Sequence, residues 1–160
     1  MGNAKAQQRT IAKEVSLTGV GLHTGANVKM TFKPAPENHG YKFKRIDLEG
    51  EPILNADASL VTNTQRGTNL EKGGVAIQTT EHVLAACVGL EIDNLLIELD
   101  ASEPPIMDGS SKFFVEALEE AGIQEQDAAR DEYIVKEVIT YRDEETGSEI
   151  ILRPSEEYQV

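Results

Sequence analysis

Glu81 and His82 are adjacent in the sequence and form its strongest candidate for a chemical site. The residues around them, 79–89, read as a helix that begins just before this pair. A helix N-terminus favours a carboxylate and disfavours an imidazolium, so the pair is expected to be an ionised acid beside a neutral imidazole near pH 7. Those are the protonation states of a general base and of a zinc ligand.

The same two residues also allow a purely structural interpretation. Glu81 would then accept hydrogen bonds from amides of the first helical turn, and His82 would be a hydrogen-bonded core residue. A single histidine does not make a zinc site, and the sequence has no His-x-x-x-His or His-x-x-x-Asp pair to supply further ligands. On spacing alone the structural interpretation is favoured.

His23 and Asp108 are further candidate site residues. His23 lies in the glycine-rich segment 19–25, whose backbone N–H groups could be open to a ligand, and it either faces that ligand or bonds locally. Asp108 begins residues 108–110 and either caps a second helix, which is the favoured interpretation, or acts as a partner of the site. Cys87, the only cysteine, is expected to be a small buried hydrophobe.

The elements that must position these residues begin with strands. Polar and apolar residues alternate in segments 15–25, 28–33 and 41–47, which predicts three strands, the last two paired as a hairpin. Residues 53–69 are weakly patterned, and their part 62–69 reads either as a polar strand or as a loop that lines the site.

Two helices are expected to follow, with a strand at 95–99 between them. The first, at 79–89, is apolar all round and is therefore expected to be buried, with a threonine as its N-cap and Gly89 at its end. The second ends at Gly122. Its apolar residues recur at helical spacing: Phe113, Phe114, Ala117, Leu118 and Ala121.

The last third of the chain contains a change of organisation. Residues 124–131 are polar and read as a linker, and segments 133–141 and 148–153 then read as a hairpin without a helix. A lone hairpin is marginal in water, so a second domain is expected to begin here. The boundaries expected are a leader or tag at 1–7, a first domain at 8–126 and the start of a second domain at 127–160.

Composition limits the class of protein. The chain has 160 residues, 28 Asp and Glu against 15 Lys and Arg, and a formal net charge of −13. Such a surface gains nothing from nucleic acid or anionic lipid, so neither is an expected partner. One cysteine excludes an intrachain disulfide and suits a reducing cytoplasm, and no apolar run is long enough to span a membrane. The one dense basic cluster is expected to be a solvated strand face: Lys42, Lys44 and Arg45.

Six sequence blocks occur in an order that closely resembles the UDP-3-O-acyl-N-acetylglucosamine deacetylases of Gram-negative bacteria. The blocks are residues 19–25 (GVGLHTG), 34–38 (PAPEN), 45–48 (RIDL), 80–86 (TEHVLAA), 89–94 (GLEIDN) and 105–110 (PIMDGS). The resemblance covers residues 8 to about 153 and implies an N-terminal fragment of such an enzyme.

The resemblance implies a fold and a reaction. The fold is α+β, a two-layer sandwich of a mixed sheet packed on two helices, similar to the second domain of ribosomal protein S5. The reaction is a zinc-dependent hydrolysis in lipid A synthesis, in the cytoplasm, that removes the N-acetyl group from UDP-3-O-acyl-N-acetylglucosamine. The product is a free amine beside acetate.

The resemblance also assigns roles to individual residues. His82 matches one of three zinc ligands, and Glu81 matches the general base that takes a proton from water. Leu22 and His23 match residues near the substrate, and Asp108 matches a residue that orients the site without binding metal. This reverses the structural interpretation of Glu81 and His82.

Several parts of the family's site have no match in this sequence. The other two zinc ligands, a late histidine acid and a threonine for the oxyanion belong to the second domain. The chain alone is therefore expected to fold, around Ala85, Ala86, Val88 and Phe114, yet to be inactive. The face that would meet the second domain is expected to be exposed and to favour self-association.

Two other functions compete with this assignment. A non-catalytic homologue would bind the sugar nucleotide or a partner without hydrolysing it. A small-molecule kinase of related fold would need a glycine-rich phosphate loop that opens a helix. Residues 19–25 instead follow a predicted strand and open no helix, so the kinase is given little weight.

Overall fold

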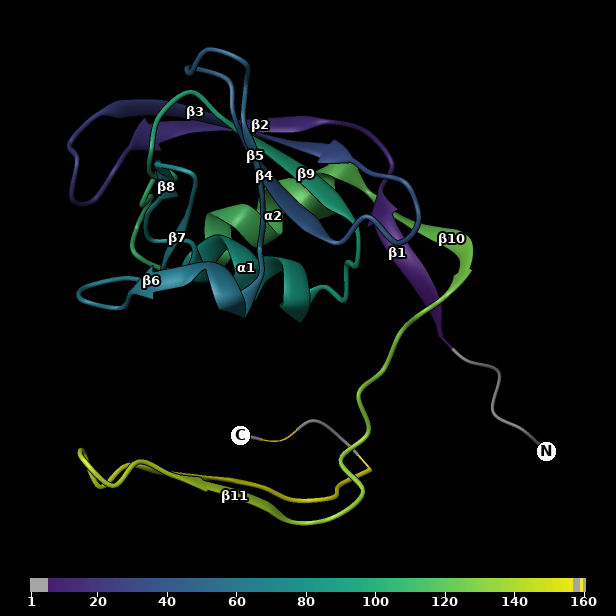
Figure 1. Cartoon of the computed structure of the whole chain (residues 1–160). Coiled ribbons are helices and arrows are strands. Elements are labelled where there is room, and N and C mark those ends of the chain that lie inside the picture. Colours follow the sequence, from purple (N-terminus) through teal and green to yellow (C-terminus); the bar gives the residue numbers. More distant parts are fainter. Residues whose placement is uncertain (1–5, 157–158, 160) are drawn as a thin grey trace. The chain divides into compact units, whose positions relative to one another are not determined.

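The computed structural model describes residues 6–156 and 159, which form two compact units, one ending at Arg130 and one beginning at Asp131. In chain order the first unit contains β1 (Gln7–Ile11), β2 (Val15–Val20), β3 (Asn27–Pro34), β4 (Tyr41–Arg45), β5 (Ile53–Asn55), the 3-10 turn η1 (Ala58–Leu60), β6 (Val61–Asn63), β7 (Asn69–Lys72), β8 (Val75–Ile77), α1 (Glu81–Gly89), β9 (Leu95–Leu99), α2 (Lys112–Ala121) and β10 (Ile123–Ala129) (Figure 1). The second unit contains β11 (Ile139–Arg142) and β12 (Glu149–Leu152).

The main sheet of the first unit has five strands in the order β2-β3-β9-β4-β5. All neighbours are antiparallel except β4 and β9, which are parallel. The predicted hairpin of residues 28–33 and 41–47 is therefore wrong, because β9 lies between the two strands and its Ile97 pairs with both Phe32 and Phe43. In this central strand the alternate residues Leu95, Ile97 and Leu99 are all buried.

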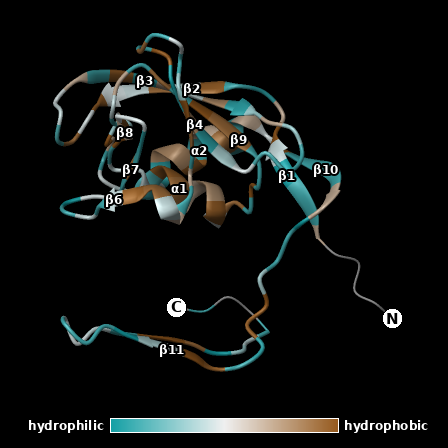
Figure 2. Cartoon of the chain, in the orientation of Figure 1, coloured by the Kyte–Doolittle hydropathy of each residue, from teal (hydrophilic) through white to brown (hydrophobic). Residues whose placement is uncertain are grey.

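Both helices lie on the same side of this sheet (Figure 1), and apolar residues colour much of their length in Figure 2. Strand β3 turns Val28, Met30 and Phe32 into the core between sheet and helices. Helix α2 contributes to this core four residues that lie on one face of the helix, three or four positions apart: Phe114, Ala117, Leu118 and Ala121. The predicted α+β class, with a mixed sheet and two helices, is confirmed.

Helix α1 is not buried all round, contrary to the prediction from its composition. Val83, Ala86 and Cys87 enter the core, whereas Ala85 and Val88 are exposed, Val88 to 62%. The first unit covers only one side of α1, so the opposite apolar side chains meet solvent within the described residues. Ala85 and Val88 are consequently not part of the core that Ala86 and Phe114 help to form.

The predicted linker at 124–131 is also wrong, because most of it is strand β10. It pairs antiparallel with β1, which begins at Gln7, the last residue assigned to the leader. Its polar side chains meet other amides: Asn94 donates to the side-chain oxygens of Gln8 and Gln126, each at 2.8 Å. Such a strand is stabilised by backbone pairing and polar contacts, so it has no hydrophobic pattern.

The weakly patterned segment before α1 forms a small three-stranded sheet, β6-β7-β8. Residues 62–69 contain both strand and loop, since both ends are strand and residues 64–68 form a turn. That this turn lines the site stays a prediction. This turn reaches the start of α1.

The second unit consists of the predicted hairpin, with Ile139 opposite Leu152 and Arg142 opposite Glu149. Residues 133–138 are not part of its strands, which are shorter than predicted. Among the described residues, no helix has the length and apolar character needed to cross a membrane.

Candidate active site

Helix α1 begins against the turn of residues 64–68. Thr80 occupies the position before the first helical residue, but its side chain does not cap the helix. Its hydroxyl instead donates to the backbone carbonyl of Thr68 at 3.0 Å, and its backbone N–H donates to the same oxygen at 3.1 Å. The predicted threonine N-cap is therefore replaced by a tertiary contact that ties the helix start to the turn.

Glu81 points onto the same turn. Its carboxylate accepts a 2.9 Å hydrogen bond from the backbone N–H of Thr68. Within the described residues it accepts nothing from the amides of its own helix, contrary to the structural interpretation of this residue. The Glu81 side chain is half-buried. Its carboxylate is therefore held by Thr68 and is still accessible to solvent.

His82 is half-buried, and its backbone carbonyl accepts a 2.9 Å hydrogen bond from the hydroxyl of Ser111. In residues 6–156 and 159 its imidazole makes no hydrogen bond. His82 is therefore not the hydrogen-bonded core histidine of the structural interpretation. Its ring nitrogens are available to a ligand.

The loop after β2 approaches the same turn from the other side. The Nε2 atom of His23 lies 2.9 Å from the backbone carbonyl of Arg66, two residues before Thr68. Turn 64–68 thus contacts both His23 and Glu81, which are 58 positions apart in the sequence. Leu22, beside His23, is 53% exposed.

Four backbone N–H groups of this loop have acceptors within the protein and are not open to a ligand, contrary to the expectation for residues 19–25. Gly21 N–H donates to Ala26 at 2.9 Å, and Gly25 N–H donates back to Gly21 at 3.1 Å. The N–H groups of His23 and Thr24 both donate to the side chain of Glu103 at 3.0 Å. A phosphate loop needs free N–H groups, so the geometry also disfavours the kinase.

Glu103 is a residue that the sequence analysis missed. Its side chain is fully buried and accepts hydrogen bonds from the hydroxyls of Thr79, at 2.8 Å, and Thr24, at 3.0 Å, besides those two N–H groups. Burial alone would raise the pKa of this carboxyl, but the hydrogen bonds from Thr24, Thr79 and His23 outweigh it and hold the pKa below its ordinary value. No local pattern marks Glu103, because all its partners are distant in sequence.

Asp108 is exposed and does not cap α2, contrary to the favoured interpretation. The helix begins at Lys112, four residues later, with Ser111 at the N-cap position. The carboxylate of Asp108 accepts from the N–H and the hydroxyl of Ser110, at 3.0 and 2.7 Å, and these bonds lower its pKa. The adjacent Ser111 contacts His82, so Asp108 lies on the segment that meets the helix start.

Two other residues named from the sequence are buried. Burial raises the pKa of the Cys87 thiol to about 12, as expected for a core hydrophobe. Arg45 is not on a solvated face: it is 7% exposed and forms an ion pair with Asp47 at 2.6 Å. Lys44, on the other face of β4, is half-buried and forms ion pairs with Glu51 and Glu98.

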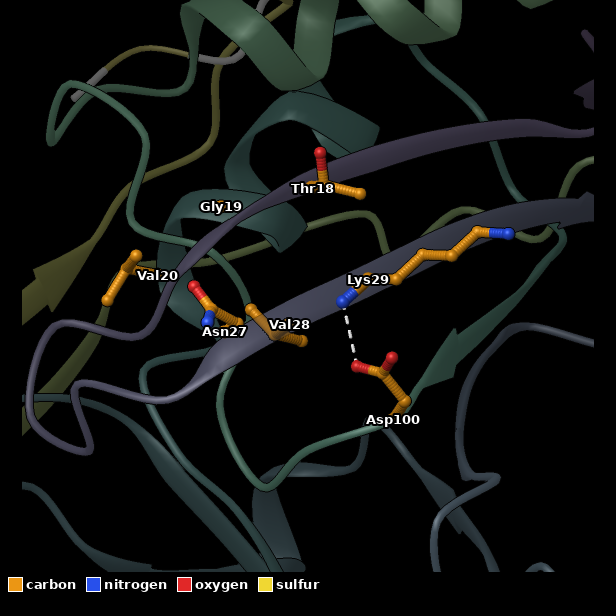
Figure 3. A pocket seen from close by; sticks show the side chains of 7 residues that line it. All are labelled: Thr18, Gly19, Val20, Asn27, Val28, Lys29 and Asp100. Atoms are coloured by element: carbon orange, nitrogen blue, oxygen red, sulfur yellow. Dashed lines mark hydrogen bonds between the residues drawn. The ribbon is translucent and has the colours of Figure 1, made fainter.

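The surface around Gly19 contains two hollows, and one of them, of about 370 Å³, is lined in part by Asp108 and Phe113. The other hollow has a volume of about 420 Å³, and in it the Lys29 backbone N–H donates to Asp100 at 2.7 Å. Figure 3 shows the side chains that line this hollow. None of the residues that line this second hollow is a candidate site residue. The lining residues are Thr18, Gly19, Val20, Asn27, Val28, Lys29 and Asp100. We therefore place no chemistry in it.

The described residues supply one suitable donor for zinc and not a whole site. Among residues 6–156 and 159 there is no group of three His, Cys, Asp or Glu side chains that could hold a metal ion. A half-buried imidazole without a hydrogen-bond partner fits a zinc ligand, so His82 can be one ligand of the three or four that such a site needs.

Comparison with known proteins identifies relatives over nearly the whole chain. A family model described as "LpxC: UDP-3-O-acyl N-acetylglycosamine deacetylase" matches residues 8–160. The "Bifunctional enzyme LpxC/FabZ" of Bacteroides thetaiotaomicron is 50% identical over 154 residues, which is 96% of this chain and 33% of that protein. The protein of the same name from Porphyromonas gingivalis is 47% identical over 96% of this chain and 33% of its own length.

A shorter relative carries the deacetylase name alone. The "UDP-3-O-acyl-N-acetylglucosamine deacetylase" of Xanthomonas campestris pv. campestris is 47% identical over 137 residues, 86% of this chain and 45% of that protein. The chain thus spans between a third and a half of the length of the curated relatives it matches.

Proposed function

The chain belongs to the UDP-3-O-acyl-N-acetylglucosamine deacetylase family, and from that premise we propose that the protein it forms part of removes the N-acetyl group of UDP-3-O-acyl-N-acetylglucosamine. The reaction is an amide hydrolysis that releases acetate and leaves a free amine on the sugar, in the cytoplasm, for lipid A synthesis. Because the relatives are two to three times longer than this chain, the matched region supplies only part of the active site in this proposal.

In this proposal residues 8–126 form the first deacetylase domain and residues 127–160 begin the second. The five-stranded sheet with two helices on one side supports a first domain similar to the second domain of ribosomal protein S5. The second domain completes the site with further zinc ligands.

Zinc would be held partly by His82, and when bound it would polarise the acetamide carbonyl as a Lewis acid. Glu81 is the general base, whose carboxylate takes a proton from the attacking water. The backbone N–H of Thr68 holds this carboxylate in a half-buried position. Leu22 and His23 bind the substrate from the loop after β2. Asp108 orients the segment 108–111, whose Ser111 hydroxyl donates to the backbone carbonyl of His82.

One observation carries the proposal. Glu81 directs its carboxylate onto turn 64–68, and the next residue, His82, has an imidazole with no hydrogen-bond partner among the described residues. On adjacent residues, a carboxylate with this tertiary support and an available imidazole supply a base and one metal ligand for metal-assisted hydrolysis. A helix that merely satisfied its own first turn would need neither.

The test is a direct assay of the complete protein. Purified protein is incubated with UDP-3-O-acyl-N-acetylglucosamine, and released acetate and free amine are measured with and without a zinc chelator. We expect acetate release that the chelator abolishes and added zinc restores. Binding of the sugar nucleotide without any acetate release would support the non-catalytic homologue.

A further inference from the structure

The buried carboxylate of Glu103 joins two segments that are far apart in the sequence. On one side it accepts from the loop after β2, through the N–H groups of His23 and Thr24 and the hydroxyl of Thr24. On the other side it accepts from the hydroxyl of Thr79, two residues before Glu81. The side chain has no exposed surface, so it cannot itself meet a substrate.

Thr79 has a backbone conformation that needs support. Its φ is 53°, in the left-handed region, which is unfavourable for a β-branched residue. Its hydroxyl is held by Glu103 at 2.8 Å, and its N–H is held by the side chain of Asn69 at 3.2 Å. Because α1 begins two residues later, these bonds set the direction in which the chain enters the helix that carries Glu81.

Glu103 thus forms a bridge between the loop after β2 and Thr79, and the groups that meet in this bridge suit a carboxylate. Every group that faces the side chain of Glu103 is a donor: two backbone N–H groups and two hydroxyls. An ionised carboxylate is an acceptor only, and bonds to it are stronger than bonds to a neutral amide. A glutamine has the same shape but would present an NH2 group to part of this set of donors.

We propose that Glu103 is a positioning residue that fixes the loop of Leu22 and His23 against the entrance of α1, so that loop and Glu81 meet the same substrate. The catalytic part of this inference rests on the proposed function. The structural part, that Glu103 holds the loop, does not.

Amide hydrogen exchange of the 160-residue chain, followed by NMR, tests the structural part without substrate. In Glu103→Gln we expect the amides of His23 and Thr24 to exchange about tenfold faster or more, because a charge-assisted acceptor is replaced by a neutral one. Amides in the β3–β9 pairing should keep their rates. The matched control is Asp100→Asn, which also replaces a carboxylate by an amide, three residues earlier. It should leave the exchange rates of the loop amides unchanged.

A second variant answers the question if Glu103→Gln does not fold. Thr79→Val has the same shape and removes only the donor on the helix side. The loop amides should then keep their rates, whereas the Thr68 amide, which donates to Glu81, should exchange faster. Unchanged rates at Thr68 in this variant, or at His23 and Thr24 in Glu103→Gln, would overturn the inference.

Steady-state kinetics of the complete protein test the catalytic part. Glu103→Gln should raise KM about fivefold or more at unchanged zinc content, because the bond energy lost falls on the loop that contacts substrate. In a His23→Ala background the same change should have a much smaller effect on KM, since both act through one loop. Equal effects of Glu103→Gln with and without His23 would overturn this part. No acetate release by the unaltered protein would instead refute the proposed function and leave the exchange result standing.

Discussion

The carboxylate of Glu81 accepts a 2.9 Å hydrogen bond from the backbone N–H of Thr68, a residue 13 positions earlier in the chain. This bond holds the carboxylate on a turn that His23 also contacts, through the carbonyl of Arg66. The candidate base is thus positioned by a different segment from the one that carries it.

Replacement of Glu81 by glutamine should separate its chemical role from its structural one. Glu81→Gln retains an oxygen that can accept from Thr68 but cannot take a proton, so kcat of the complete protein should fall by about 10² or more. Zinc content, measured by atomic absorption, should stay at the level of the unaltered protein. Glu120→Gln, an exposed change on α2, is the control and should leave kcat unchanged. Loss of zinc together with activity would show that Glu81 is a metal ligand or a structural residue.

The 160-residue chain by itself should fold but hold no zinc tightly. His82 is one ligand, and tight sites need three or four ligands held together. Circular dichroism should therefore report folded protein, whereas atomic absorption after dialysis should find far less than one zinc per chain. Gel filtration of the same sample tests the expected self-association. One tightly held zinc with measurable acetate release would mean that residues within this chain complete the site.

In the complete protein, His82→Ala should reduce both zinc content and turnover. The effect has a direct cause, since the half-buried imidazole is the donor that this chain supplies. His39→Ala is the matched control, because His39 is half-buried like His82 and its ring contacts only the carbonyl of the adjacent Gly40 within the described residues. Full zinc content in His82→Ala would exclude His82 as a ligand.

Gly21→Ala should destabilise the chain by about 1–3 kcal/mol, the usual cost of overpacking. A Cβ at this position would lie 2.3 Å from the Thr24 hydroxyl and 2.6 Å from the Glu103 carboxylate, so the bridge must shift to accommodate it. Gly89→Ala is the comparison, because a Cβ there meets nothing within 4 Å, and alanine favours the helix. Urea unfolding of both variants measures the difference, and equal stability would show that the loop tolerates the displacement.

The stability that Glu103 contributes should depend on pH in the acid range. Its pKa in the folded chain lies below the ordinary value of 4.5, so the contribution is complete above that pH and is lost as the pH falls through the folded pKa. The free energy of unfolding should therefore differ most between the unaltered chain and Glu103→Gln near pH 7, and the difference should shrink below pH 4.5. A difference that is constant from pH 7 to pH 3 would contradict an ionised, hydrogen-bonded Glu103.

Cys87 should resist thiol reagents in the folded chain. It is fully buried, and burial raises its pKa to about 12, so almost no thiolate is present at pH 8. A colorimetric thiol assay should detect no reaction in buffer and one thiol per chain after unfolding in guanidinium chloride. Rapid reaction in buffer would mean that α1 opens readily.

Features that depend on neighbouring residues were predictable from the sequence. Helices α1 and α2 and strands β3 and β9 were all expected at nearly their observed positions, because hydrophobic periodicity and glycine stops act within one element. The pair Glu81 and His82 was identified at the start of its helix for the same reason. Its chemical interpretation came from the resemblance of six sequence blocks, since spacing alone favoured a structural role.

Features that depend on distant partners were decided only by the tertiary structure. Strand β9 enters between β3 and β4, and polar β10 pairs with β1 across more than 110 residues, because strand neighbours are selected by non-local contacts. The exposure of Val88 likewise depends on what covers α1. Glu103 has no local pattern at all: its burial is tolerated only because His23, Thr24 and Thr79 converge on it. A buried charge is stabilised by the groups that surround it in space, and their positions are a property of the folded chain.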